Sequence, residues 1–179
     1  MAFTALTGGA PDTGFTTKLN NNFYSGTRVL SHNITSSTAN TSTYTNMASH
    51  TIASSLSSTI NKGILIMVTA YSTFNGSGNG SLGTAAHGAL DIKVGTSGAE
   101  ASKLELSPMV YAYGYSSGGG TDTHGGSGTN TYFCYYEPSA GEKSSGFNVL
   151  IQGKYVVTAG SSSATVTHYQ SVVFATYDA

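Results

Sequence analysis

The feature that most constrains the fold is an alternation between two kinds of segment, which begins near Thr27 and continues almost to the end of the chain. Stretches rich in Val, Ile, Thr, Tyr and Phe are separated by stretches of Gly, Ser and Asn. This pattern is typical of an all-β sandwich or barrel. We expect eight strands, which favours an eight-stranded antiparallel jelly-roll β-sandwich. The expected strands are residues 27–33, 43–53, 63–74, 88–95, 103–115, 130–137, 146–158 and 165–177.

The N-terminal segment, residues 1–25, differs from the β domain expected over residues 26–179. Phe15, Leu19 and Phe23 recur at the spacing of one helical stripe, so a short helix or an extended attachment segment is expected here. The polar residues between them have weak helix propensity, so this stripe needs a surface to dock on. That surface is either its own domain, other copies of the chain or a larger assembly.

Composition excludes several classes of partner. Only 8% of the residues are charged, and 7 Lys and Arg stand against 8 Asp and Glu, whereas binding to nucleic acid or to an anionic membrane needs clustered basic residues. The longest apolar run, residues 63–68, is far shorter than a membrane-spanning helix. The N-terminus shows neither the basic nor the apolar region of a secretory signal. We expect no nucleic-acid partner, no membrane insertion and no export.

Some of the expected strands are apolar on both faces. Tyr111, Tyr113 and Tyr115 line one side of their strand and small or apolar residues line the other, and residues 132–136 are apolar or aromatic in both phases of the alternation. A single sandwich has only one core. The second face therefore predicts an interface between copies, where Tyr is enriched. The alternative is that these tyrosines lie on the surface with their hydroxyls in water.

The expected loops fall into two sets if each strand crosses the domain. One end collects the charged loops and both chain termini, and we treat it as a base. The other end collects long neutral loops rich in Gly, Ser and Asn, and we treat it as a tip. The candidate tip residues are Asn75, Asn79, Asp122 and His124.

No motif in the chain predicts catalysis. Residues 78–83 match G-x-G-x-x-G, but a strand rather than a helix is expected to follow, so we interpret them as a Gly-rich loop. Neither a Walker A sequence nor G-x-S-x-G occurs. Asp122 and His124, with His87 nearby, could be gathered by symmetry copies as metal ligands; the alternative is that they are solvated polar residues. We expect no enzyme activity, no cofactor and no bound metal.

Four stretches resemble phage fibre and other virion-attached proteins. Residues 8–23, with Leu19-Asn20-Asn21-Asn22-Phe23, look like the segment that leads into the body of such proteins. Residues 43–52 and 58–68 are similar to the first hairpin of their β-sandwich heads, and residues 171–175 resemble their closing strand. The resemblance implies a trimeric jelly-roll head that an N-terminal segment fixes to a particle.

We therefore expect a virion structural protein, either a surface fibre or spike head or a receptor-binding attachment domain. Its expected partners are itself, as a homotrimer, and other virion proteins through Phe15, Leu19 and Phe23. A host surface glycan or receptor is a candidate partner at the tip, where weak contacts gain strength from multivalency. The alternatives are a capsid decoration (cement) protein that stabilises the capsid lattice and a secreted carbohydrate-binding module.

Overall fold

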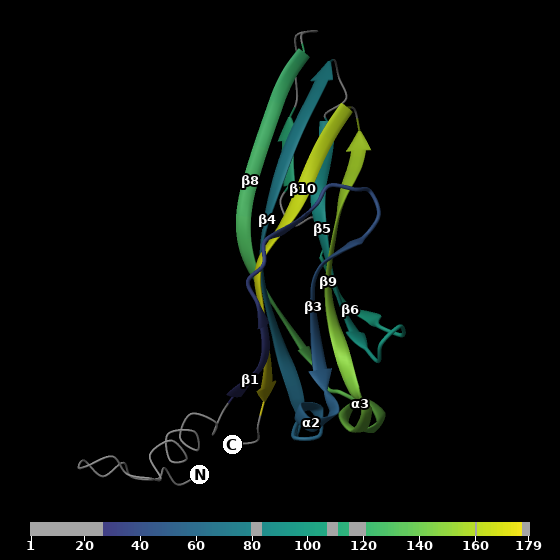
Figure 1. Ribbon diagram of the computed structural model, residues 1–179. Coiled ribbons are helices and arrows are strands. Elements are labelled where there is room, and N and C mark those ends of the chain that lie inside the picture. Colours follow the sequence, from purple (N-terminus) through teal and green to yellow (C-terminus); the bar gives the residue numbers. More distant parts are fainter. Residues whose placement is uncertain (1–26, 80–83, 107–110, 115–120, 160, 177–179) are drawn as a thin grey trace, which may run out of the picture.

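The chain folds into two antiparallel sheets that pack face to face, as the computed structural model shows (Figure 1). The structure describes residues 27–79, 84–106, 111–114, 121–159 and 161–176. The expected all-β sandwich is confirmed. The N-terminal stripe of Phe15, Leu19 and Phe23 lies outside the described residues, and so does Tyr115.

The first sheet, sheet A, has the strand order β1-β10-β4-β8, and a short strand, β2, pairs with β10. Its strands are β1 (Thr27–Asn33), β2 (Ser37–Ala39), β4 (Gly63–Asn79), β8 (Thr121–Tyr136) and β10 (Ser161–Thr176).

The second sheet, sheet B, has the order β3-β9-β5-β6, and β7 also pairs with β5. Its strands are β3 (Thr45–Ala53), β5 (Thr84–Gly95), β6 (Ala101–Leu106), β7 (Tyr111–Gly114) and β9 (Gly146–Ala159). Two short helices join the sheets, α2 (Ser54–Ser57) and α3 (Ala140–Ser145).

The described residues form ten strands rather than the expected eight. The expected strand 103–115 is two strands, β6 and β7, and Pro108 stands between them in the sequence. The short β2 was not expected, because three residues carry too little periodicity to predict a strand.

The prediction that the candidate tip residues lie in loops is wrong. Asn75 and Asn79 belong to β4 and pair with Gly125 and Thr121 of β8. Asp122 and His124 belong to the same ladder, opposite Gly78 and Gly76. Ladder hydrogen bonds use the backbone alone, so a Gly- and Ser-rich stretch of β4 extends as a strand when β8 and β10 flank it.

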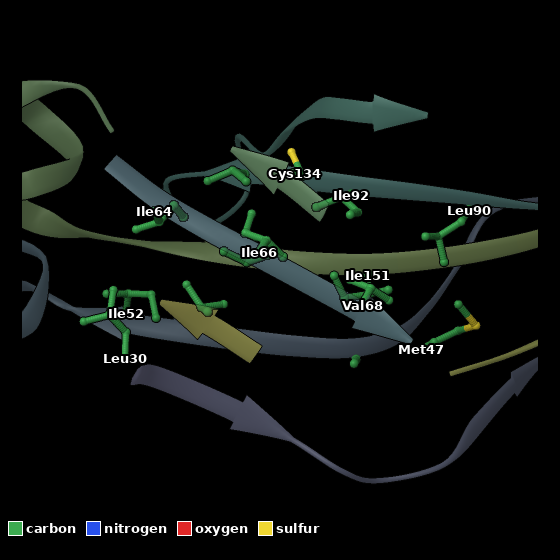
Figure 2. Close-up of a cluster of buried hydrophobic side chains, with 14 of the residues drawn as sticks. Leu30, Met47, Ile52, Ile64, Ile66, Val68, Leu90, Ile92, Cys134 and Ile151 are labelled. Carbon is green, nitrogen blue, oxygen red and sulfur yellow. The ribbon is translucent and has the colours of Figure 1, made fainter. Parts of the chain in front are cut away.

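The core lies between the sheets and follows the alternation of each strand (Figure 2). Ile64, Ile66 and Val68 of β4 point inward, opposite Ile92 of β5 and Ile151 of β9, and all five are fully buried. Each side chain of this size contributes about 1.5–3 kcal/mol when buried. The central strands β4, β5 and β9 therefore hold the sandwich together.

One end of the sandwich carries both helices and both ends of the described chain, and we call it the base (Figure 1). Thr27 pairs with Thr176 there, and Gly63 pairs with Thr176 on the other side. The helices α2 and α3 contact each other, with the Ser57 hydroxyl donating to the Lys143 carbonyl at 2.8 Å. This matches the expected grouping of the charged loops with the chain ends. None of the helices in the described ranges is long and apolar enough to cross a membrane.

Candidate functional site: the outer face of sheet A

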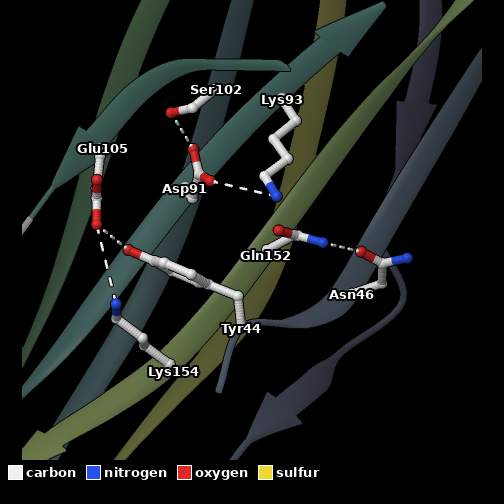
Figure 3. Close-up of polar contacts among 8 residues, drawn as sticks. All are labelled: Tyr44, Asn46, Asp91, Lys93, Ser102, Glu105, Gln152 and Lys154. Carbon is white, nitrogen blue, oxygen red and sulfur yellow. Dashed lines mark hydrogen bonds and ion pairs between the residues drawn. The ribbon is translucent and has the colours of Figure 1, made fainter. Parts of the chain in front are cut away.

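Many polar side chains on the outer face of sheet B pair with one another (Figure 3). The Tyr44 hydroxyl donates to Glu105 Oε1 at 2.7 Å, and Lys154 Nζ lies 3.9 Å from the same oxygen and 4.0 Å from the centre of the Tyr44 ring. Burial, together with the hydrogen bond to Glu105, raises the pKa of the Tyr44 phenol, so Tyr44 remains the donor of this bond.

The same pairing continues across the rest of this face. Ser102 Oγ donates to Asp91 Oδ1 at 2.6 Å, and Lys93 Nζ lies 3.9 Å from Asp91 Oδ2. Gln152 Nε2 donates to Asn46 Oδ1 at 2.6 Å. Asp91 is nearly buried, and Gln152 Oε1 is buried without a hydrogen-bond partner in the described part of the chain. The charged side chains of this face thus pair largely with one another.

The outer face of sheet A carries a band of apolar side chains that crosses four strands at the base end. The strand register aligns them in two rows: Val29, Phe174, Leu65 and Tyr135 are successive neighbours. Val172, Met67 and Phe133 form the next row, which the exposed His32 of β1 continues beside Val172. We call the seven apolar residues the apolar band. Their alternate neighbours on β4, Ile64 and Ile66, point into the core, so both faces of the sheet are apolar here.

Water reaches much of the apolar band. The exposed fraction is 58% for Phe133, 51% for Tyr135 and 52% for Val29, while the side chains between them are half-buried. The described outward positions of β4, β8 and β10 hold no Asp, Glu, Lys or Arg. An exposed apolar patch without charge is the kind of surface that a partner covers.

Tyr135 is held in a fixed position within the band. A Cβ atom on Gly63 would lie 2.6 Å from Tyr135 Cζ, so the ring lies across β4 in the space that the missing side chain leaves. The Tyr135 hydroxyl donates to Glu137 Oε1 at 3.0 Å. The ring therefore packs against the sheet and stays half exposed, with its hydroxyl already hydrogen-bonded.

Farther from the base the same face becomes polar. Thr69 and Thr131 hydroxyls lie 3.0 Å apart, and Gln170 Nε2 donates to Thr69 Oγ1 at 3.4 Å. The rings of Tyr71 and Tyr169 stack with their centres 6.0 Å apart. The apolar band thus has a polar border toward the far end of the sheet.

A buried polar cluster joins the two sheets beneath this face. Ser171 Oγ lies 2.7 Å from His50 Nε2 and 2.9 Å from His168 Nε2. The other ring nitrogens reach Ser31 Oγ and the Thr35 carbonyl, both at 2.9 Å. All four ring nitrogens are hydrogen-bonded, so the cluster is a structural link between sheets.

The electrostatics of this cluster favour neutral imidazoles. Burial lowers the pKa of His50 to about 4, and the nearby His168 and His32 contribute to the same shift. Burial also lowers the pKa of His168, against a hydrogen bond to the Thr35 carbonyl that raises it. Both rings are therefore neutral near pH 7.

An open groove of about 410 Å³ lies beside α3 at the base, lined among others by Val94, Lys103, Tyr136 and Glu142. Burial opposes ionisation of Glu142, but hydrogen bonds from Ser139 and Tyr136 lower its pKa. Burial and the bond to Glu142 raise the pKa of Tyr136 to about 12. This carboxylate completes the capping box of α3.

The sequence-predicted residues are distributed over both sheets. Tyr111 and Tyr113 lie in β7 of sheet B and pair with His87 and Ala85 of β5, so they are not part of the apolar band on sheet A. The candidate tip residues lie on β4 and β8, at the end of sheet A away from the base. In the described part of the chain, no group of three or more His, Cys, Asp and Glu side chains could hold a metal ion.

Comparison with known families and curated proteins found no relative of this chain. No family model matches the chain, and no curated protein sequence matches it significantly.

The sequence contained a signal for the apolar band on three strands, because residues 63–68 of β4 and 172–174 of β10 are apolar in both phases, as β8 is. Residues 132–136 are apolar in both phases, and the structure places Cys134 inside and Phe133 and Tyr135 outside. Outward partners such as Leu65 and Phe174 were missed, because which strands lie side by side depends on long-range pairing. The His50, Ser171 and His168 cluster was also missed, although His50 and His168 both stand at inward positions of their strands.

Proposed function

We propose that the chain is a homo-oligomeric structural protein of a virus particle: the jelly-roll head of a surface fibre or spike, or an attachment domain, fixed by its N-terminal segment. The observation that carries this proposal is the contrast between the outer faces of the two sheets. Sheet B pairs its own charges, whereas sheet A exposes an uncharged apolar band at the base. An exposed apolar surface of this kind is more stable when another copy covers it than when a monomer leaves it in water.

The pairing of strands supports a jelly roll. β1 pairs with β10, β3 with β9, β4 with β8 and β5 with β6. These pairs are nested in chain order, as in one long hairpin, and the further pairs β10 with β4 and β5 with β9 roll that hairpin into two sheets. Rolled hairpins of this kind occur in capsid and lectin domains.

The ionisable groups support a structural role without catalysis. His50, His168 and Glu142 are buried titratable groups whose pKa is lowered, by burial for the two histidines and by hydrogen bonds for Glu142. The hydrogen bonds of the two histidines join the sheets, and those of Glu142 cap α3. The assignment to a virion rests on the resemblance of residues 8–23, 43–52, 58–68 and 171–175 to virion-attached proteins.

Two measurements test the proposal. Light scattering on the purified chain should give the mass of a homo-oligomer, and an antibody against the chain should label fibres or spikes of purified particles in electron micrographs. Label spread over the capsid lattice would instead support the decoration protein. A monomer at every concentration, or particles without label, would contradict the proposal, and a monomer that binds glycan would support a carbohydrate-binding module.

A further inference from the structure

We propose that the apolar band is the contact surface between copies of this chain, so that Phe133 and Tyr135 of each copy are buried by a neighbouring copy. This inference rests on the proposed function, which requires an oligomer, and adds which surface makes it. The band is Val29, Leu65, Met67, Phe133, Tyr135, Val172 and Phe174.

Charge favours a second copy over nucleic acid or an anionic membrane as the occupant of the band. The described outward side chains of β4, β8 and β10 carry no formal charge, so the two rows of the band can meet those of a second copy without like-charge repulsion. The Glu137 carboxylate, directly after β8, is hydrogen-bonded to the Tyr135 hydroxyl. The lack of charge on the band itself gives no attraction to nucleic acid or to an anionic membrane. An apolar surface is complementary to another apolar surface, and every copy supplies one.

The size and arrangement of the band fit the centre of such an interface. The band crosses four strands, and three interstrand spacings of ~4.8 Å make it roughly 14 Å wide. Half-exposed Phe133 and Tyr135 each leave on the order of 100 Å² of surface to be covered. Specific interfaces have an apolar core surrounded by a polar rim, and Thr69, Thr131 and Gln170 supply that rim.

Tyr135 has the properties of an interface anchor. Its ring already lies across Gly63, and its hydroxyl donates to Glu137 Oε1. The side chain therefore loses little conformational entropy when a partner binds. Preorganised aromatic side chains at the centre of an interface contribute most of the binding energy. The neighbouring Phe133 is the most exposed residue of the band.

The location of the band agrees with attachment through the N-terminal segment. Val29 stands two residues after Thr27, where the described chain begins. Thr27 pairs with Thr176 at the base. Copies that meet in parallel through this band bring their chain starts to one end of the assembly. β8 is also the edge of sheet A, so a neighbour on the band can cover this edge as well.

The test compares two double variants of the full chain by sedimentation over a wide range of concentration. Phe133→Ser with Tyr135→Ser should raise the dissociation constant of the oligomer at least about 30-fold, the effect expected from losing an interface anchor. The matched control is Ile34→Ser with Val157→Ser, which removes two exposed apolar side chains outside the band. The control should assemble like the unmodified chain.

A second measurement needs no variant and therefore does not depend on correct folding of one. Hydroxyl-radical footprinting of the unmodified chain should show that oxidation of Phe133 and Tyr135 falls as the oligomer forms, while oxidation of Ile34 does not change. Equal assembly of both double variants, with Phe133 and Tyr135 still reactive in the oligomer, would overturn the band as the interface and leave the oligomer in place.

A different result separates the two proposals. A chain that is monomeric throughout contradicts the oligomer itself, and with it this interface. If Phe133 and Tyr135 are nevertheless protected in that monomer, another part of the same chain covers the band, with the stripe of Phe15, Leu19 and Phe23 as the segment to test by substitution to Ser.

Discussion

Two histidines share one hydroxyl inside the sandwich, and this arrangement shows how single residues link the sheets. His50 comes from β3 of sheet B, whereas His168 and Ser171 come from β10 of sheet A. A buried polar group is tolerated when its hydrogen bonds are complete, and here every ring nitrogen has a partner. The network therefore adds a specific connection to an otherwise apolar core.

The lowered pKa of His50 makes stability depend on pH. Above the unfolded value of 6.5 the ring is neutral in both states, so it adds no pH dependence; as the pH falls from 6.5 to about 4, the unfolded chain takes up a proton that the folded chain does not. The free energy of unfolding should fall by up to about 3 kcal/mol over this range. Urea unfolding at a series of pH values measures it.

The control for this prediction is His50→Leu. The variant is less stable near pH 7, because the hydroxyls of Ser31 and Ser171 each lose a partner. Its stability should nevertheless vary less between pH 6.5 and 4 than that of the unmodified chain. Equal slopes in both proteins would show that His50 does not titrate as described.

Removal of the shared hydroxyl should cost more than removal of an ordinary serine. Ser171→Ala leaves one nitrogen of His50 and one of His168 buried without their partner, and we expect a loss of about 2–4 kcal/mol in the free energy of unfolding. Ser49→Ala, at an exposed position of β3 beside His50, should change it by less than about 0.5 kcal/mol. Equal effects would contradict the bridging role.

At the scale of the elements, the distance between the sheets is set by small residues as much as by large ones. Gly88 of β5 faces Ser72 of β4 and Val166 of β10 across the core. A Cβ atom at this position would lie 2.4 Å from Ser72 Oγ and 2.6 Å from Val166 Cγ2. Contacts that short force the sheets apart, so this position needs a glycine.

Gly88→Ala should therefore destabilise the chain by about 1–3 kcal/mol, the usual cost of overpacking. Gly141→Ala is a matched control, because its nearest neighbour is Ser139 Oγ at 3.9 Å and it lies in α3. Alanine is favoured over glycine in a helix, so the control should be neutral or slightly stabilising. Thermal unfolding followed by circular dichroism compares the two, and similar melting temperatures would refute the close approach.

The strands themselves were largely predictable from their periodicity. β1, β3 and β9 begin and end within two residues of the predicted segments, because strands with one inward and one outward face alternate in sequence. The extensions of β4, β8 and β10 were not predictable. Their Gly, Ser and Asn residues carry no period, and only the neighbouring strands turn them into a ladder.

At the scale of the whole molecule, the division into a charged outer face and an apolar one predicts how assembly responds to salt. If copies meet through the uncharged band of sheet A, no attraction between charges holds them together, so salt has no such attraction to screen. The dissociation constant of the oligomer should therefore change by less than about threefold between low and high salt. Sedimentation at several salt concentrations measures this, and strong weakening by salt would point to charged residues of sheet B as the interface.

The sequence by itself determined the β class, the inward alternation of the core strands and the presence of residues apolar in both phases on β4, β8 and β10. These properties depend on the order of residues within one segment, so they are visible in a single strand without its neighbours. Only the tertiary structure decided that β1, β10, β4 and β8 lie side by side, and so that Val29, Phe174, Leu65 and Tyr135 form one continuous row. Strand neighbours are chosen by pairing between residues far apart in the chain, and a surface made from several strands does not exist until that pairing is complete.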